Sequence, residues 1–196
     1  MGTNISLNSH ALIYLFLCSI LSSCASSDSR IEEDMEQLYS SAINIPIELM
    51  QRFDCHSSVP EVIHSEGYKM VVYTDSTECS SCAIGHLYVW EPILDSLMTF
   101  PEYNETVFIF APSKTDCSKV EKELRYSDFK YPVYLDTCNV FAELNNIPIN
   151  RLMHTFLIDK EGRVVLVGNP LSNSKIQELL FKVLNSERID DTCQDM

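Results

Sequence analysis

The stretch Val71–Leu87, VVYTDSTECSSCAIGHL, decides the fold prediction. It opens inside a β-branched and aromatic run, residues 69–74, which is typical of a buried strand. A polar turn follows, and then Cys79 and Cys82 enclose two serines and lead into an apolar segment that suits a helix. A C-x-x-C between a strand and a helix leaves three interpretations open: a redox pair, a metal clip or a structural disulfide.

Hydrophobic periodicity predicts alternating strands and helices on both sides of this stretch. An apolar helical segment should run on to about residue 100, with a bend at Pro92. The other predicted elements are helices at 31–41, 116–127, 139–145 and 172–184, a short helix or strand at 47–53, strands at 106–111 and 131–136, and a hairpin of 154–159 with 163–168. This order predicts one α/β domain whose mixed sheet is covered by helices on both faces, with a C-terminal β-hairpin followed by a helix.

The N-terminal residues are typical of an export signal. Residues 1–23 contain no Lys, Arg, Asp or Glu, and Ala11–Leu21 is an apolar run too short to span a bilayer. The tetrapeptide Leu-Ser-Ser-Cys at 21–24 resembles a bacterial lipobox, which implies a signal peptide of residues 1–23 and acylation of Cys24. Ordinary secretion and a buried N-terminal helix are the alternatives.

The rest of the chain divides by composition into a tether, 24–30, an N-terminal extension, 31–65, a domain, 66–186, and an acidic tail, 187–196. The formal net charge of −14 argues against nucleic acid as a partner and against electrostatic binding to anionic lipid. We therefore expect membrane contact only through the lipid anchor, and a location in the cell envelope that faces the periplasm or the cell surface. Disulfides form and persist in such compartments.

Two motifs resemble the thioredoxin superfamily, especially its membrane-anchored, periplasm-facing thiol–disulfide oxidoreductases. They are CSSC at 79–82 and HTFLIDKEGRVVLVGNP at 154–170, which looks like the final hairpin of that family. The resemblance implies a thioredoxin-like fold, protein thiols and disulfides as substrates, an unknown redox partner and no cofactor beyond the redox disulfide. It also implies that Cys79 is the exposed nucleophile and Cys82 the buried resolving thiol. Amides at the start of a helix favour the thiolate form of a cysteine that caps it.

Several positions depart from the family pattern. Glu78 stands where the family often has Trp, and its negative charge would oppose thiolate formation at Cys79. Tyr73 replaces a buried acid, so Asp75 and Glu78 remain as candidate bases. Met153 stands where the family has a cis-proline, and we expect a trans bond there because a cis bond before a non-proline residue costs about 2.5–4 kcal/mol.

His154, next to Met153, has three interpretations: a loop residue before a buried strand, an imidazole that faces Cys79 and modulates it, or a metal ligand. In the last case Cys79, Cys82 and His154 would bind copper or zinc, and the protein would bind or deliver metal. His86 is predicted to be an ordinary helix residue. Glu78, Met153 and His154 are thus the candidate modulators of the redox pair.

The remaining cysteines allow further bridges. Cys117 and Cys138 each follow a predicted strand, so a structural disulfide between them is one prediction, while Cys55 and Cys193 either pair or stay free. A third functional alternative is a non-catalytic thioredoxin-like interaction module in which CSSC is a permanent disulfide.

Overall fold

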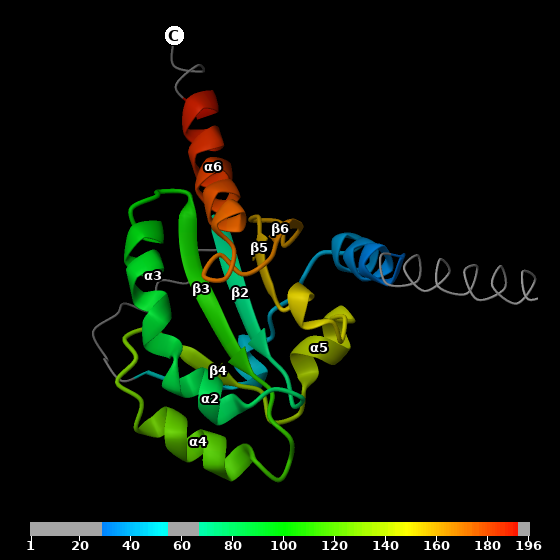
Figure 1. Ribbon diagram of the computed structural model, residues 1–196, viewed down its shortest axis with the longest axis vertical. Coiled ribbons are helices and arrows are strands. Elements are labelled where there is room, and N and C mark those ends of the chain that lie inside the picture. The colour runs from blue at the N-terminus through cyan, green and yellow to red at the C-terminus, as the bar shows by residue number, and fades with distance from the viewer. Residues whose placement is uncertain (1–28, 55–66, 192–196) are drawn as a thin grey trace, which may run out of the picture.

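The computed structural model describes residues 29–54 and 67–191 (Figure 1). Its centre is a six-stranded sheet in the order β1-β4-β3-β2-β5-β6. The strands are β1 (Gln51–Phe53), β2 (Tyr68–Thr74), β3 (Tyr103–Phe110), β4 (Val133–Leu135), β5 (Thr155–Ile158) and β6 (Val164–Val167). The predicted signal peptide and the residues Cys24, Cys55 and Cys193 lie outside the described residues.

Strand direction brings the chemistry-bearing loops together at one edge of the sheet. β2 and β3 are parallel, as are β3 and β4, whereas β2 with β5, β5 with β6 and β1 with β4 are antiparallel. The loop that follows β2 therefore lies beside the start of β5, and the Tyr73 amide donates to the His154 carbonyl over 2.8 Å. The mixed α/β architecture confirms the predicted thioredoxin-like fold class.

The two faces of the sheet bury different clusters because successive strand residues point to opposite sides. On β2, Met70 packs with residues of α2 (Ser80–Gly85), α3 (Glu91–Leu97), α4 (Cys117–Arg125) and α6 (Ser174–Asp191). Val71 and Tyr73 pack instead with Phe141 of α5 (Val140–Asn145) and with Leu38 of the helix at 29–39. Helices thus cover both faces, as predicted (Figure 1).

The helical segment after the C-x-x-C differs from its prediction. It is divided into α2, the 3-10 helix η2 (Leu87–Trp90) and α3, and α2 ends at His86, its C-cap residue. Pro92 lies in the first turn of α3, where the missing amide hydrogen sacrifices no helical bond. The predicted bend at Pro92 is therefore wrong: Pro92 helps to start a new helix.

The later elements follow the predicted order. The hairpin β5–β6 turns through Gly162, whose φ of +80° is accessible to glycine at little cost. A 3-10 helix, η3 (Arg151–Met153), precedes β5. The final helix α6 continues to Asp191, so its backbone extends into the segment predicted as an acidic tail.

The N-terminal extension packs on the same domain rather than lying apart from it. Residues 47–53 form η1 (Ile47–Leu49) and β1, and β1 pairs with β4. Leu38 is 1% exposed in the second core cluster, and the Ile43 amide donates to the Gly162 carbonyl over 2.8 Å. Among the described residues, no helix combines the length and the apolar character needed to cross a membrane.

Candidate redox site

The Cys79–Cys82 pair lies at the edge where β2, β3 and β4 end and β5 begins. The two sulfurs form a disulfide, with their Cα atoms 5.3 Å apart. Cys79 is the N-cap residue of α2, and its Sγ accepts a hydrogen bond from the Cys82 amide over 3.3 Å. A backbone donor thus faces the sulfur that the sequence assigns as the nucleophile, and such a donor stabilises a thiolate.

Exposure at this turn differs from the prediction for Cys82. Cys79 and Cys82 are both exposed, whereas Ser80, between them, is only 8% exposed. The short helix turns Ser80 toward the protein, so the expectation of a buried Cys82 is wrong. Exposure therefore does not show which cysteine is the nucleophile. The hydrogen bond from the Cys82 amide to Cys79 Sγ does distinguish the two.

The loop that leads into Cys79 is held by polar contacts. The Asp75 carboxylate accepts hydrogen bonds from the Thr77 amide, 2.8 Å, and from the Thr77 hydroxyl, 2.7 Å. Arg151 of η3 donates to the Thr77 carbonyl over 2.7 Å. Asp75 is thus engaged in shaping the turn, and the contact of Arg151 is one that no feature of the sequence indicated.

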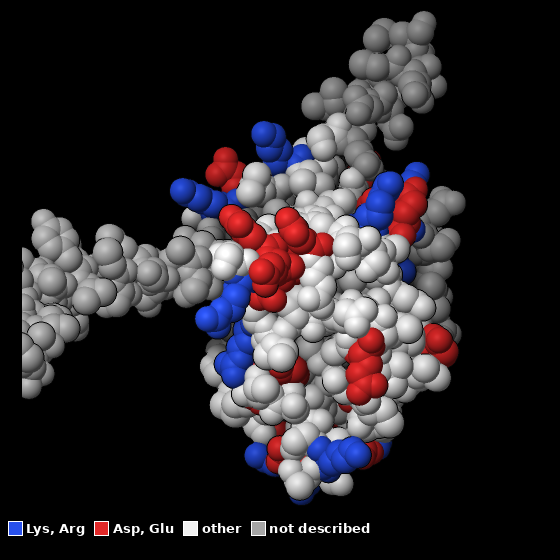
Figure 2. All heavy atoms as spheres, turned by 90° about the vertical axis from the view of Figure 1, so that its right-hand side faces the viewer, with Lys and Arg blue, Asp and Glu red and all other residues white. Residues whose placement is uncertain are grey.

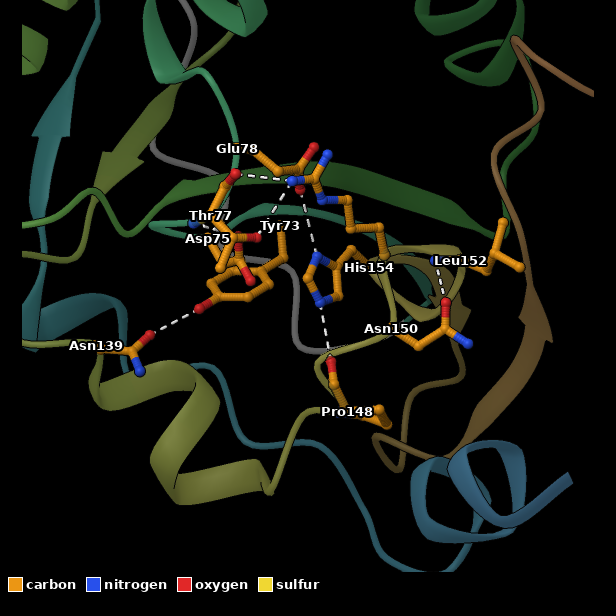
Figure 3. Close-up of polar contacts among 10 residues, drawn as sticks. Tyr73, Asp75, Thr77, Glu78, Asn139, Pro148, Asn150, Leu152 and His154 are labelled. Atoms are coloured by element: carbon orange, nitrogen blue, oxygen red, sulfur yellow. Dashed lines mark hydrogen bonds and ion pairs between the residues drawn. The ribbon is translucent and has the colours of Figure 1, made fainter. Parts of the chain in front are cut away.

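His154 is buried, with 3% exposure, at the start of β5. Its Nε2 lies 2.9 Å from the Pro148 carbonyl oxygen and its Nδ1 lies 3.4 Å from Oε1 of Glu78 (Figure 3). The two side chains that the sequence named as modulators, Glu78 and His154, therefore contact each other.

The copper or zinc hypothesis needs His154 to direct a nitrogen at the two sulfurs. Both of its ring nitrogens face oxygen atoms, and the two sulfurs are bonded to each other. Within residues 29–54 and 67–191, no group of three His, Cys, Asp or Glu side chains is arranged to hold a metal ion. The geometry gives the metal hypothesis no support.

Met153 and Tyr73 occupy the positions where the sequence departs from the family. Met153 is 2% exposed at the end of η3, and the described part of the chain contains no cis peptide bond, as expected for Met153. Tyr73 is 5% exposed, and its hydroxyl donates to Oδ1 of Asn139 over 2.6 Å (Figure 3). Burial raises the pKa of Tyr73, so this phenol stays neutral and supplies a hydrogen bond rather than a base.

The opposite side of α2 contacts α4. The Ser81 hydroxyl donates to Oε1 of Glu123 over 3.0 Å, and Nζ of Lys119 lies 3.9 Å from the same oxygen. Sequence reasoning missed this contact because Ser81 and Glu123 are far apart in the chain and neither position forms a motif.

Two hollows flank α2. One, of about 530 Å³, is lined by Glu78, Ala83 and His86 together with the segment 151–155 and the start of α6. The other, of about 770 Å³, lies between α2 and α4, with Ser81, Ile84, Tyr88 and Tyr126 among its walls. Hollows therefore lie on both sides of the helix that begins after Cys79.

The other predicted cysteine bridge does not form. Cys117 and Cys138 are both free thiols. Cys117, the first residue of α4, donates from Sγ to the Ser113 carbonyl over 3.3 Å, and Cys138 is exposed. His86, as predicted, is an exposed residue at the end of α2, and its Nδ1 lies 2.6 Å from the Cys82 carbonyl oxygen.

No family model and no curated protein matches the sequence. Solved structures with a similar backbone include a protein assigned as the thiol:disulfide interchange protein DsbE of Chlorobium tepidum, with 16% identity, a TM-score of 0.46 and coverage of 61% of this chain and 82% of that chain. The exposed lipoprotein thioredoxin Etrx1 of Streptococcus pneumoniae is 17% identical, with a TM-score of 0.39 and coverage of 62% and 85%. The thioredoxin domain of a thiol-disulfide oxidoreductase from Bacteroides vulgatus is 13% identical, with a TM-score of 0.39 and coverage of 59% and 80%.

The strand order, together with a C-x-x-C disulfide at the start of the helix after β2, defines a thioredoxin-like fold.

Proposed function

We propose that this protein is a thiol–disulfide oxidoreductase of the cell envelope that acts on exported proteins, with Cys79 as the nucleophile and Cys82 as the resolving thiol. One observation carries the proposal: an accessible disulfide begins the helix after the central strand, and a backbone amide faces the sulfur of Cys79. The export-type N-terminal sequence supports an envelope location, with Cys24 as the lipid-bearing residue.

In the reducing direction, the Cys79 thiolate attacks one sulfur of a substrate disulfide. The substrate S–S bond breaks, and its other sulfur leaves as a thiolate that takes up a proton. The Cys82 thiolate then attacks the Cys79 sulfur, which re-forms the Cys79–Cys82 bond and releases the second substrate thiol. Two electrons pass from the protein to the substrate, and the reverse sequence oxidises a substrate dithiol. The reduction potential relative to the compartment sets the direction.

Reduction of insulin by the domain, with a dithiol as electron source, tests the proposal. We expect turnover by the wild-type protein and none above background by Cys79→Ser, because that variant lacks the attacking sulfur. Cys138→Ser is the matched control, since it removes an exposed thiol outside the pair and should leave turnover unchanged.

The absence of turnover in the wild type, or full turnover in Cys79→Ser, would reject the proposed oxidoreductase function. In that case copper or zinc that co-purifies in equimolar amount and is lost in His154→Ala would indicate the metal-binding alternative. A disulfide that resists reductant, with an unperturbed Cys79 thiol, would indicate a non-catalytic module.

A further inference from the structure

The contact between His154 and Glu78 has a consequence for charge next to the redox pair. A carbonyl oxygen can only accept a hydrogen bond, so Nε2 of His154, 2.9 Å from the Pro148 carbonyl, carries a hydrogen. Nδ1 then faces Oε1 of Glu78 at 3.4 Å. A lone pair does not bind a carboxylate, so this contact is attractive only when one proton lies between the two side chains.

With one proton between the two side chains, the pair is neutral as a whole. The pair is either an imidazolium with a carboxylate or an imidazole with a carboxylic acid, and the net charge is zero in both forms. The rings of Tyr73 and His154 form a T-shaped pair, with centroids 5.0 Å apart and an angle of 69° between their planes. Burial of His154 and the fixed Pro148 contact thus keep the imidazole in place beside Glu78 (Figure 3).

We propose that His154 is a positioning residue that neutralises Glu78, and that this neutralisation preserves the thiolate of Cys79 despite the glutamate that precedes it. The proposal rests on the proposed function and assigns a task to two residues of that site. Without His154, the Glu78 carboxylate would stand as an uncompensated negative charge on the residue adjacent to Cys79, and a like charge disfavours a second anion.

The other charged and titratable groups around this pair have different partners. Asp75 accepts two hydrogen bonds from Thr77, and Arg151 donates to the Thr77 carbonyl. His86 of the α2 terminus contacts the Cys82 carbonyl. The Tyr73 hydroxyl donates to Asn139. Among residues 29–54 and 67–191, the side chain that contacts the Glu78 carboxylate is that of His154, with Nδ1 3.4 Å from Oε1.

A pH titration of thiolate absorbance in the reduced protein tests this inference with four proteins: wild type, Glu78→Gln, His154→Asn and the double variant. Cys79→Ser identifies the signal of Cys79, and His86→Asn is the matched histidine control. We expect His154→Asn to lower the fraction of Cys79 thiolate at neutral pH by about tenfold, because the Glu78 charge is then uncompensated. Glu78→Gln and the double variant should both titrate like the wild type.

The recovery in the double variant is decisive. If His154 only supported the local structure, removing the Glu78 charge would not restore the titration, and the double variant would resemble His154→Asn. Equal titration of the wild type and His154→Asn would also overturn the inference. Should the His154 variants fail to fold, Glu78→Gln decides alone: a neutral pair predicts no change, whereas an uncompensated carboxylate predicts a transition at lower pH.

Failure of this inference is distinguishable from failure of the proposed function, since the titration requires no turnover. A wild-type protein that does not reduce insulin rejects the oxidoreductase, whatever the four titrations give. If the wild type reduces insulin but the thiolate titrations do not show the predicted loss in His154→Asn and recovery in the double variant, only the role of His154 is rejected.

Discussion

The two sides of the redox helix are held in different ways. On the β5 side, the entering loop is fixed by charged and buried groups: Arg151 on the Thr77 carbonyl and the Glu78–His154 pair. On the α4 side, Ser81 donates a hydrogen bond to Glu123, and Ile84 lies in the same apolar cluster as residues of α4. We therefore expect the β5 side to influence the charge at Cys79 and the α4 side to influence mainly the position and stability of the helix.

Figure 2 views the molecule from the side on which α5 lies in Figure 1, and uncharged residues occupy most of this face, with acidic groups gathered in patches.

The largest expected effect concerns Asp136, which binds the amides at the start of α5. Asp136 is 1% exposed, and its carboxylate accepts hydrogen bonds from the amides of Cys138, Val140 and Phe141 at 3.2, 3.0 and 2.8 Å. Asp136→Ala leaves these amides at the start of α5 without their acceptor, so we expect the free energy of unfolding to fall by roughly 2–4 kcal/mol. Urea unfolding measures the loss.

Asp128→Ala is the control for that experiment, because Asp128 is an exposed acid outside α5 and its removal should change the free energy of unfolding by less than about 0.5 kcal/mol. Equal stability of the two variants would show that Asp136 does not hold α5.

A smaller effect is expected for Tyr73→Phe. The substitution keeps the ring contacts with His154 and Phe141 but removes the hydrogen bond to Asn139. We expect a loss of about 1 kcal/mol in the free energy of unfolding, with insulin reduction retained, because the buried phenol is not a base of the reaction. Loss of turnover in a folded Tyr73→Phe protein would contradict that assignment.

The comparison of the two sides is tested directly by Ser81→Ala and Arg151→Ala. Ser81→Ala should lower the free energy of unfolding by about 0.5–1.5 kcal/mol and leave the rate of thiol–disulfide exchange with glutathione nearly unchanged. Arg151→Ala should alter the exchange rate more than the stability, because it frees the loop that leads into Cys79.

Paired measurements of urea unfolding and of the rate of reaction with glutathione check both variants. Lys160→Ala serves as a control, since Lys160 is an exposed cation at the turn of the hairpin, away from the Thr77 loop. The opposite ranking, with Ser81→Ala changing exchange more than Arg151→Ala, would remove the distinction between the two sides.

The smallest effect concerns the far end of the hairpin that carries His154. Burial raises the pKa of Asp159, but the hydrogen bonds and charge of Arg163 and the Glu161 amide outweigh it and hold that pKa below its usual value. Because the pKa of Asp159 is lower in the folded than in the unfolded state, its charge stabilises the fold at pH values above the unfolded-state pKa of about 3.9. This stabilisation is lost as the pH falls through the folded-state pKa.

Asp159→Asn should therefore be less stable than the wild type at neutral pH, and the difference should shrink in acid. Urea unfolding at a series of pH values measures it. A difference that stays constant down to strongly acidic pH would show that the Asp159 charge makes no contribution.

Much of the fold follows from local sequence patterns. Alternating β-branched runs and helical stripes place β2 to β6 and α4 to α6, and Gly162 marks the hairpin turn. The division of the helix after Cys82 was not predictable from Pro92 alone, because a proline is equally compatible with a bend and with a first turn. β1 was ambiguous because three residues are too few to show a period.

The site was predictable in its residues and less so in its contacts. The C-x-x-C spacing and the position of His154 were evident from the sequence. The Glu78–His154, Arg151–Thr77 and Ser81–Glu123 contacts depend on tertiary packing between residues distant in the chain. The exposure of Cys82 depends on the rotation of a short helix, which periodicity over six residues does not fix.

The most direct test of the account is to trap the reaction intermediate. Cys82→Ser and Cys79→Ser are each incubated with a disulfide-containing peptide, quenched and mapped by mass spectrometry. The account predicts a stable mixed disulfide on Cys79 in Cys82→Ser, and little or none on Cys82 in Cys79→Ser. Faster capture of the peptide by Cys82 than by Cys79 would contradict it.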